Sequence, residues 1–222
     1  GFKPTLRGDG LLIPMAGEEE LTSAVVEELV VGLLNPDQKA RFIAEREIDL
    51  GYSYKDKARF RVNVYFQKGY MAAAMRLVPA KIKTLDEMEM PSVLPSFSGL
   101  SQGFVLVVGP AGHGKSATLA AMLDEINHIR KEHIITVEDP IEYLFTPDKC
   151  MVSQREVGID TVDFHRALKS ILRQDPDVIM IGEMRDQESI STALTAAETG
   201  HLVFSTLHTN SASQTIDRII DT

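Results

Sequence analysis

Apolar residues follow two different spacings in the first third of the chain. From Glu18 to Leu34 they recur at the interval of an amphipathic α-helix. The segment Asn35–Asp37 then supplies a helix cap, a first-turn proline and a first-turn acid, which predicts a second helix. Between Ala58 and Gln67 apolar and polar residues alternate, which predicts a half-buried strand. The alternation resumes over Met71–Leu77 after a Lys68–Gly69 turn, so we expect an antiparallel partner strand.

These elements indicate a small α+β domain over residues 1–79. Residues 80–100 are crowded with proline and serine, and we expect them to be an inter-domain linker. The linker contains one expected short helix, opened by the capping pair Thr84 and Glu87.

Short apolar runs alternate with helical patterns in residues 101–222. Such runs are typical of strands buried on both faces, and helices between them favour a largely parallel sheet of βαβ units. We therefore predict an α/β second domain. Its expected strands are Phe104–Val108, Ile134–Val137, Val178–Ile181 and Leu202–Leu207, and the expected helix after the first strand is Ser116–Ile129.

The residues between the first of these strands and its helix fit the P-loop pattern. Glycines let the backbone curl so that successive N–H groups face an anion, and the helix N-terminus adds partial positive charge. Lys115 would reach the terminal phosphates, and the Ser116 hydroxyl would bind magnesium. The pattern predicts binding of ATP with Mg²⁺ by Gly109, Pro110, Ala111, Gly112, His113, Gly114, Lys115, Ser116 and Ala117.

Polar side chains follow three of the predicted strands. Because ligands of open α/β sheets lie beyond the carboxyl ends of the strands, we expect these side chains to converge near the P-loop. For any single carboxylate the alternative is a solvated loop acid, and a lone histidine could equally be structural. The side chains are Glu138, Asp139, Glu142, Glu183, Thr206 and His208.

Composition narrows the class of protein. The 222 residues are 44% hydrophobic and 25% charged, as in an ordinary globular chain. Apolar runs are far shorter than the roughly 20 residues of a membrane span, and no export signal opens the sequence, so we expect a cytoplasmic protein without a transmembrane segment. Cys150 is the only cysteine and is expected to be a packing residue. The net charge of -9 disfavours direct nucleic-acid binding.

Four segments of the second domain carry sequence motifs, namely the P-loop and residues 135–142, 182–186 and 200–209. Together they resemble the type II/IV secretion ATPase superfamily. Two further segments, 194–200 and 215–221, are more similar to its retraction ATPases of twitching motility than to its pilus-assembly ATPases. The similarity covers the second domain, and residues 58–63 extend it into the first. The four segments are the P-loop as Walker A, 135–142 as the Asp box, 182–186 as an atypical Walker B and 200–209 as the His box.

The resemblance implies a homo-hexamer whose subunits combine a PAS-like α+β domain with a RecA-like P-loop domain. Such a ring hydrolyses ATP and retracts type IV pili, acting on a membrane-embedded platform protein and the pilus machinery at the cytoplasmic face of the inner membrane. The chain lacks an initiator methionine and ends within a helical pattern, so we expect it to be a fragment, with the tail used for retraction beyond Thr222.

The resemblance also assigns roles to individual residues. Glu142 would be the general base, Glu183 would help to hold magnesium and its water shell, and His208 would sense the γ-phosphate. A neighbouring subunit's nucleotide could be reached by Arg59, Arg61 and Arg76, whose alternative is an exposed polar strand face.

Some positions differ from the family, and other functions stay open. Ala111, His113 and Ala117 replace the residues that the family usually has, although backbone N–H groups rather than these side chains form the phosphate cradle. A pilus-assembly or type II secretion ATPase would share the same chemistry. A switch that binds ATP without turnover is a further alternative, and a RecA-type DNA translocase is disfavoured by the acidic charge.

Overall fold

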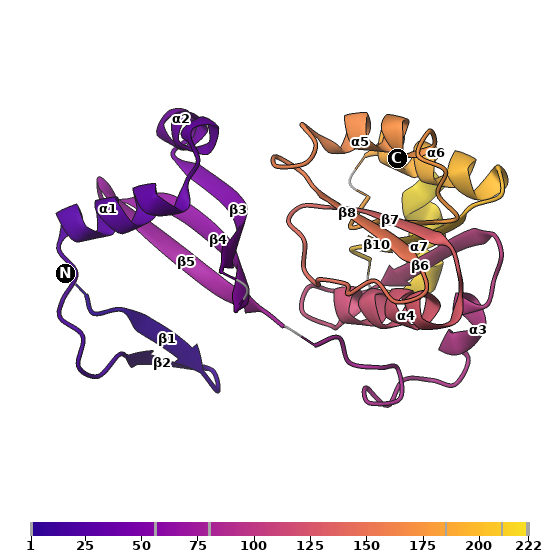
Figure 1. Cartoon of the computed structure of the whole chain (residues 1–222), viewed down its shortest axis with the longest axis horizontal. Helices are drawn as coiled ribbons and strands as arrows, with labels where there is room; N and C mark the ends of the chain where they lie inside the picture. The colour runs from indigo at the N-terminus through magenta and orange to yellow at the C-terminus, as the bar shows by residue number, and fades with distance from the viewer. Residues whose placement is uncertain (1, 56, 80, 185, 210, 221–222) are drawn as a thin grey trace. The chain divides into compact units, whose positions relative to one another are not determined.

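The computed structural model of the chain forms two compact units, Gly1–Leu77 and Val78–Thr222 (Figure 1). The structure describes residues 2–55, 57–79, 81–184, 186–209 and 211–220. Arg185 and Asp221, which belong to two of the motif segments, lie outside the described residues.

The first unit packs two helices on one face of a three-stranded sheet. Its helices are α1 (Ser23–Leu33) and α2 (Pro36–Glu45), and the strand order is β3–β4–β5. The core joins buried Val30 and Phe42 of the helices to alternate residues of the strands. A separate hairpin, β1 (Thr5–Gly8) with β2 (Leu11–Pro14), precedes them, and the three strands are β3 (Glu47–Tyr54), β4 (Ala58–Gln67) and β5 (Tyr70–Val78).

Capping side chains set where these helices begin. The prediction that the first helix starts at Glu18 is wrong, because Thr22 accepts a hydrogen bond from the Val25 N–H and so caps a helix that starts at Ser23. The predicted cap of the second helix is confirmed. Asn35 accepts from the Gln38 N–H at 2.8 Å, and the Gln38 side chain accepts from the Asn35 N–H at 3.0 Å.

The segment between the two expected domains folds onto the second unit. Leu85 is buried there, and Thr84 and Glu87 exchange the expected capping bonds at 3.1 and 3.0 Å. The predicted helix at this point is nevertheless wrong. Glu89 adopts a left-handed conformation (φ 53°), which ends the segment after a single turn, and the short helix α3 forms instead at Leu94–Ser98.

The second unit is built on a five-stranded sheet of order β6–β10–β9–β7–β8, and every neighbouring pair is parallel. The predicted parallel sheet is therefore confirmed. Four strands match the apolar runs of the sequence, whereas the polar edge strand β8 was not predicted. The strands are β6 (Gly103–Val108), β7 (His133–Glu138), β8 (Met151–Glu156), β9 (Val178–Ile181) and β10 (Leu202–Leu207).

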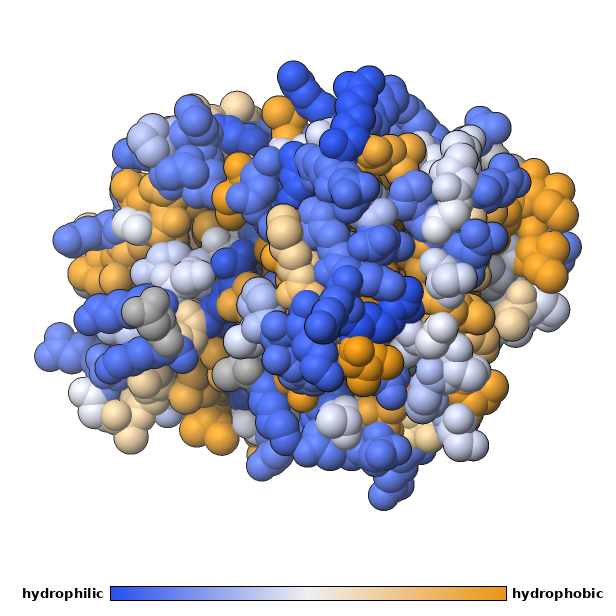
Figure 2. All heavy atoms as spheres, turned by 45° about the vertical axis from the view of Figure 1, so that its right-hand side comes forward, coloured by the Kyte–Doolittle hydropathy of each residue, from blue (hydrophilic) through white to orange (hydrophobic). Residues whose placement is uncertain are grey.

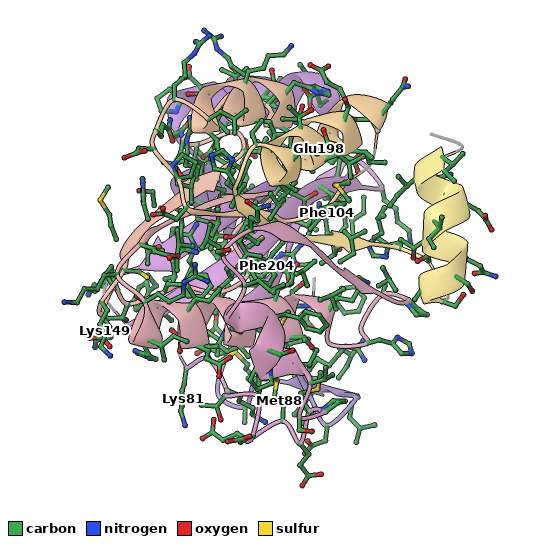
Figure 3. The ribbon with its side chains drawn as sticks, turned by 90° about the vertical axis from the view of Figure 1, so that its right-hand side faces the viewer. Lys81, Met88, Phe104, Lys149, Glu198 and Phe204 are labelled. Atoms are coloured by element: carbon green, nitrogen blue, oxygen red, sulfur yellow. The ribbon has the colours of Figure 1, made fainter. Side chains whose placement is uncertain are left out.

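Successive residues of the central strands pack on opposite helical layers. Ile134 of β7 and Phe204 of β10 pack with α4 (Lys115–Ile129), and Figure 3 shows Phe204 in the interior of this unit. The next residue of β7, Ile135, packs instead with α5 (Phe164–Ile171) and α6 (Gln187–Glu198) on the other face (Figure 1). Because side chains alternate along a strand, two helical layers are needed to bury both faces. Helix α7 (Ala212–Ile220) follows β10.

The outer surface mixes polar and apolar side chains, as the face drawn in Figure 2 shows. Among the described residues, no helix combines the length and apolar character that crossing a bilayer requires. Cys150 is buried, and its Sγ donates to the carbonyl oxygens of Arg130 at 3.3 Å and Ile126 at 3.6 Å. Burial raises the pKa of this thiol, which fits the packing role expected for it.

Candidate functional site

A glycine-rich loop joins β6 to α4. Gly109, Gly112 and Gly114 have φ angles of 152°, 79° and 82°, which side chains with a Cβ rarely adopt. A Cβ at Gly112 or Gly114 would meet nothing within 4 Å, so backbone conformation rather than crowding requires glycine. No side chain caps the N-terminus of α4. Its first N–H groups can therefore face an anion.

Lys115, the first residue of α4, is 8% exposed. Its ammonium donates to the carbonyl oxygens of Gly109 at 2.9 Å and Pro110 at 3.0 Å, so the charge lies within the loop. Ser116 and Ala117 follow it as partly buried residues of the first helical turn. The P-loop geometry thus brings a cation and an uncapped helix end to one place, which is what a polyphosphate requires.

A residue that follows one central strand contacts this cation and joins it to a carboxylate that follows the neighbouring strand. His208, after β10, has Nδ1 3.4 Å from the Lys115 Nζ and Nε2 3.3 Å from an oxygen of Glu183, which follows β9. Thr206 links the same two strand ends, because its hydroxyl donates to the Gly182 carbonyl oxygen at 2.8 Å. The expected convergence of strand ends on the P-loop is present for these residues.

Glu138, the last residue of β7, is 5% exposed. Its carboxylate accepts hydrogen bonds from the Thr136 hydroxyl at 2.7 Å, the Glu142 N–H at 3.2 Å and the Gln154 amide at 3.3 Å. Burial raises the pKa of Glu138, and these hydrogen bonds oppose the rise. Glu138 is therefore a buried anchor of its loop rather than a solvated acid.

Gly182 lets the ends of β9 and β7 approach closely. A Cβ there would lie 3.3 Å from the Val137 carbonyl oxygen and 3.4 Å from the Glu138 Cα, tighter than most contacts allow. The Gly182 N–H donates to that same oxygen at 2.8 Å. A side chain at this position would crowd the backbone at the end of β7.

The other two carboxylates that follow β7 differ in exposure. Asp139 is exposed, whereas Glu142 is partly buried on the irregular segment that follows β7. Burial raises the pKa of the neighbouring Tyr143 phenol, and the charge of Glu142 adds to that rise. The charge of Glu142 also adds to the raised pKa of Glu138, so the three side chains share one neighbourhood.

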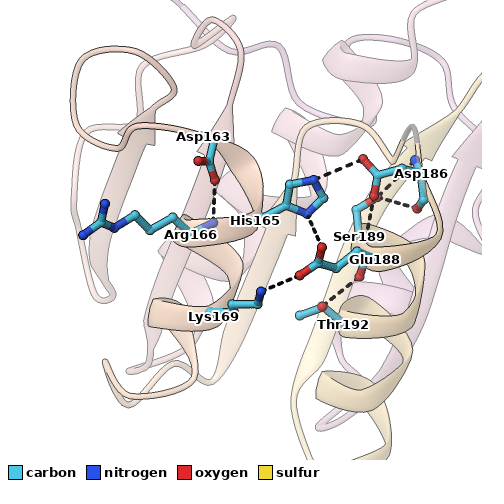
Figure 4. A network of polar contacts seen from close by, with 8 residues as sticks. All are labelled: Asp163, His165, Arg166, Lys169, Asp186, Glu188, Ser189 and Thr192. Atoms are coloured by element: carbon cyan, nitrogen blue, oxygen red, sulfur yellow. Dashed lines mark hydrogen bonds and ion pairs between the residues drawn. The ribbon is translucent and has the colours of Figure 1, made fainter.

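The segment after Glu183 is fixed to α5 by charged contacts (Figure 4). Asp186 caps α6 by accepting from the Ser189 N–H at 2.8 Å, and this hydrogen bond lowers the pKa of Asp186. Glu188 in the first turn of α6 lies 3.1 Å from His165 and 2.7 Å from Lys169, both of α5. These contacts hold the start of α6, and with it the end of the motif that contains Glu183.

The three candidate arginines lie in the first unit. Arg59 and Arg61 alternate along β4 with the buried Val62 and neighbours, and Arg76 is exposed on β5. The Arg59 guanidinium donates to the Ser53 hydroxyl at 3.1 Å. Their contact with a neighbouring subunit stays a prediction.

The expected binding of magnesium by Ser116 and Glu183 stays a prediction. Among the described residues, no cluster of three or more histidine, cysteine, aspartate or glutamate side chains could hold a metal by itself. Magnesium usually takes few protein ligands and completes its shell with water and phosphate oxygens. One hydroxyl and one carboxylate, as predicted at Ser116 and Glu183, would be a sparse set of this kind.

Sequence reasoning missed the polar side chains that hold the segment after β7. Gln154 belongs to the unpredicted strand β8, and Asn127 is fully buried in α4. An asparagine directly after Ile126 on the apolar face of a helix is the one signal that could have drawn attention to it.

The chain combines a parallel sheet between two helical layers with a P-loop that joins β6 to α4. These features place it in the class of α/β P-loop proteins. The chain belongs to the type II/IV secretion system protein family, whose model matches residues 21–222. It is similar over its full length to the type IV pilus retraction ATPase PilT of Pseudomonas aeruginosa, with 47% identity over 221 residues. It is also 45% identical over 202 residues, 91% of the chain, to the twitching motility protein of Neisseria gonorrhoeae.

Among solved structures, the chain resembles the pilus retraction motor PilT with bound ADP. The TM-score is 0.94 at 43% identity, and the match covers all of this chain and 64% of that one. The predicted RecA-like α/β fold, preceded by a small α+β domain, is thereby confirmed. The chain spans 64% and 54% of the lengths of the Pseudomonas and Neisseria relatives.

The raised pKa of Glu138 predicts how stability depends on pH. Because the unfolded chain ionises this group near its ordinary value of 4.5, the stability linked to its protonated form is present below pH 4.5 and is lost as pH rises through the folded pKa. In Glu138→Gln this loss is absent. The free energy of unfolding of the variant, taken relative to that of the parent, should therefore increase between pH 4.5 and 7, by up to about 1.4 kcal/mol per pH unit.

Urea denaturation at a series of pH values measures this difference. Glu198→Gln, at an exposed position of α6, controls for the loss of one carboxylate. A constant difference between Glu138→Gln and the parent over this range would contradict the proposed cause.

Proposed function

We propose that this chain is the nucleotide-binding part of a hexameric ATPase motor that retracts type IV pili. The contact chain Lys115–His208–Glu183 carries the proposal, because it joins a P-loop cation to two strand ends that carry a histidine and a carboxylate. Two relatives named for pilus retraction and twitching motility support the mechanical role.

ATP binding would use the geometry of the P-loop. The N–H groups around Gly112 and Gly114 would surround the phosphates, and Lys115 would exchange its bonds to the Gly109 and Pro110 carbonyl oxygens for bonds to phosphate oxygens. Ser116 and Glu183 would hold Mg²⁺ and its water shell. The ion, when bound, neutralises charge on the phosphates.

Hydrolysis needs a group that orients or deprotonates water, and we assign that role to Glu142. Glu142 follows β7, whose carboxyl end lies at the same edge of the sheet as that of β6, and its N–H bonds Glu138 at the end of β7. The more deeply buried Glu138 is less suited to the role, since its oxygens already accept three hydrogen bonds. His208 would sense the γ-phosphate through its position between Lys115 and Glu183.

The proposed active site is completed by assembly. Arg59, Arg61 and Arg76 would contact the nucleotide of a neighbouring subunit in a homo-hexamer. An arginine supplied in trans can accelerate phosphoryl transfer by about 10³ to 10⁵. The ring would act on a membrane-embedded platform protein of the pilus machinery, at the cytoplasmic face of the inner membrane.

Two other functions would use the same loop. A pilus-assembly or type II secretion ATPase shares the family and the chemistry, and differs in mechanical output. A regulatory switch would bind ATP without turnover. Phosphate release distinguishes the switch from the motors, and the number of pili on the host cell distinguishes the two motors.

Lys115→Ala is predicted to weaken ATP binding by about 30-fold or more, because the phosphates lose a buried charge partner. Isothermal titration calorimetry with ATP and Mg²⁺ measures the affinity. Lys149→Ala, at an exposed lysine of the same unit, should bind as the parent does. Equal affinity of Lys115→Ala and the parent would remove the P-loop from the proposal.

Glu142→Gln is predicted to keep ATP affinity and to lose at least about 100-fold in kcat, because the amide cannot accept a proton from water. Phosphate release at saturating ATP, followed as protein concentration rises, measures both turnover and its dependence on assembly. Glu198→Gln is the matched control. Full turnover of Glu142→Gln would exclude the base assignment, and a parent that binds ATP without releasing phosphate would favour the switch.

Deleting the gene in its host distinguishes retraction from assembly. We expect excess pili together with loss of twitching, since pili that cannot be withdrawn accumulate on the cell. Pilus counts by electron microscopy and colony spreading give the result, and complementation with the intact gene provides the control. A loss of pili would show an assembly motor instead.

A further inference from the structure

The segment between β7 and β8, which includes Glu142, has no regular secondary structure. Backbone groups in such a segment need partners from elsewhere. Side chains supply those partners at the start of the segment. The Ile141 N–H donates to Glu156 at 3.1 Å, and the Glu142 N–H donates to Glu138 at 3.2 Å.

Gln154 of β8 holds the middle of this segment with both ends of its amide. Its Oε1 accepts from the Phe145 N–H at 2.9 Å, and its Nε2 donates to the Tyr143 carbonyl oxygen at 2.7 Å. The same Nε2 lies 3.3 Å from an oxygen of Glu138. One side chain therefore binds the backbone directly after Glu142 and also the carboxylate that accepts the Glu142 N–H.

Asn127 of α4 holds the far end of the segment in the same way. Its Nδ2 donates to the Thr146 carbonyl oxygen at 2.8 Å, and its Oδ1 accepts from the Asp148 N–H at 3.0 Å. Helix α4 starts at the P-loop, so this contact ties the far end of the segment to the nucleotide-binding helix. Asn127 bonds the backbone several residues after Glu142, whereas Gln154 bonds Tyr143, the residue next to Glu142.

We propose that Gln154 is a positioning residue for hydrolysis, which holds the Glu142 carboxylate in register with the P-loop by bonding the backbone beside it. The inference rests on the proposed function, in which Glu142 is the base. Gln154 itself touches no reacting atom and acts only through the segment. Since a displacement of about 1 Å of a catalytic group can cost roughly 100-fold in rate, such a residue affects turnover rather than binding.

Gln154→Met tests the role, because methionine is close to glutamine in length and neither donates nor accepts strongly at its end. We expect kcat for ATP to fall roughly 100-fold while KM and the calorimetric ATP affinity stay as in the parent. Gln174→Met is the matched control. Its amide bonds Ser170 in the same unit, away from this segment, and the variant should hydrolyse ATP as the parent does.

Amide hydrogen exchange tests the same role without turnover. In Gln154→Met, peptides over residues 140–148 should lose about tenfold in protection, while peptides of β6 and β10 keep theirs and report an intact fold. Unchanged protection of 140–148, or normal kcat in Gln154→Met from a parent that hydrolyses ATP, would overturn the inference. A parent without turnover would instead contradict the proposed function, and the exchange result would still decide whether Gln154 orders the segment.

Discussion

The burial of both faces of one parallel sheet is the constraint on which the rest of the second unit depends. Ile134 and Ile135 are adjacent in sequence and fully buried, yet they pack on helices of opposite layers. Each such side chain contributes about 1.5–3 kcal/mol by leaving water. That gain fixes the register of the strands, and parallel register brings all their carboxyl ends to one edge.

The chemistry of the site follows from that edge. Lys115, His208 and Glu183 come from positions far apart in the chain and meet only because β6, β10 and β9 are neighbours. Burying Lys115 and Glu138 costs free energy, since each removes a charge or a polar group from water. Each therefore has hydrogen-bond partners, which include the P-loop carbonyl oxygen of Gly109 for Lys115 and the Glu142 N–H for Glu138.

Side chains, rather than backbone ladders, order the segment after β7. Glu138, Gln154 and Asn127 each bond its backbone from a different element. A segment held in this way is ordered by side chains although it lacks secondary structure. Hydrogen bonds thus join the segment that carries the candidate base to the P-loop helix α4 and to β8.

Sequence alone determined the parts that depend on local pattern. The four apolar runs predicted β6, β7, β9 and β10, the glycine spacing predicted the P-loop, and the segment Asn35–Asp37 predicted the cap of α2. Two local predictions were wrong. The first helix starts later than predicted because Thr22 caps it, and the helix predicted after Thr84 ends as a single turn because Glu89 is left-handed. Only the tertiary structure decided that Glu138 is buried, that the polar strand β8 joins the sheet, and that Gln154 reaches the Glu142 segment. Those facts depend on which strands are neighbours, and spacing along a chain does not carry that information.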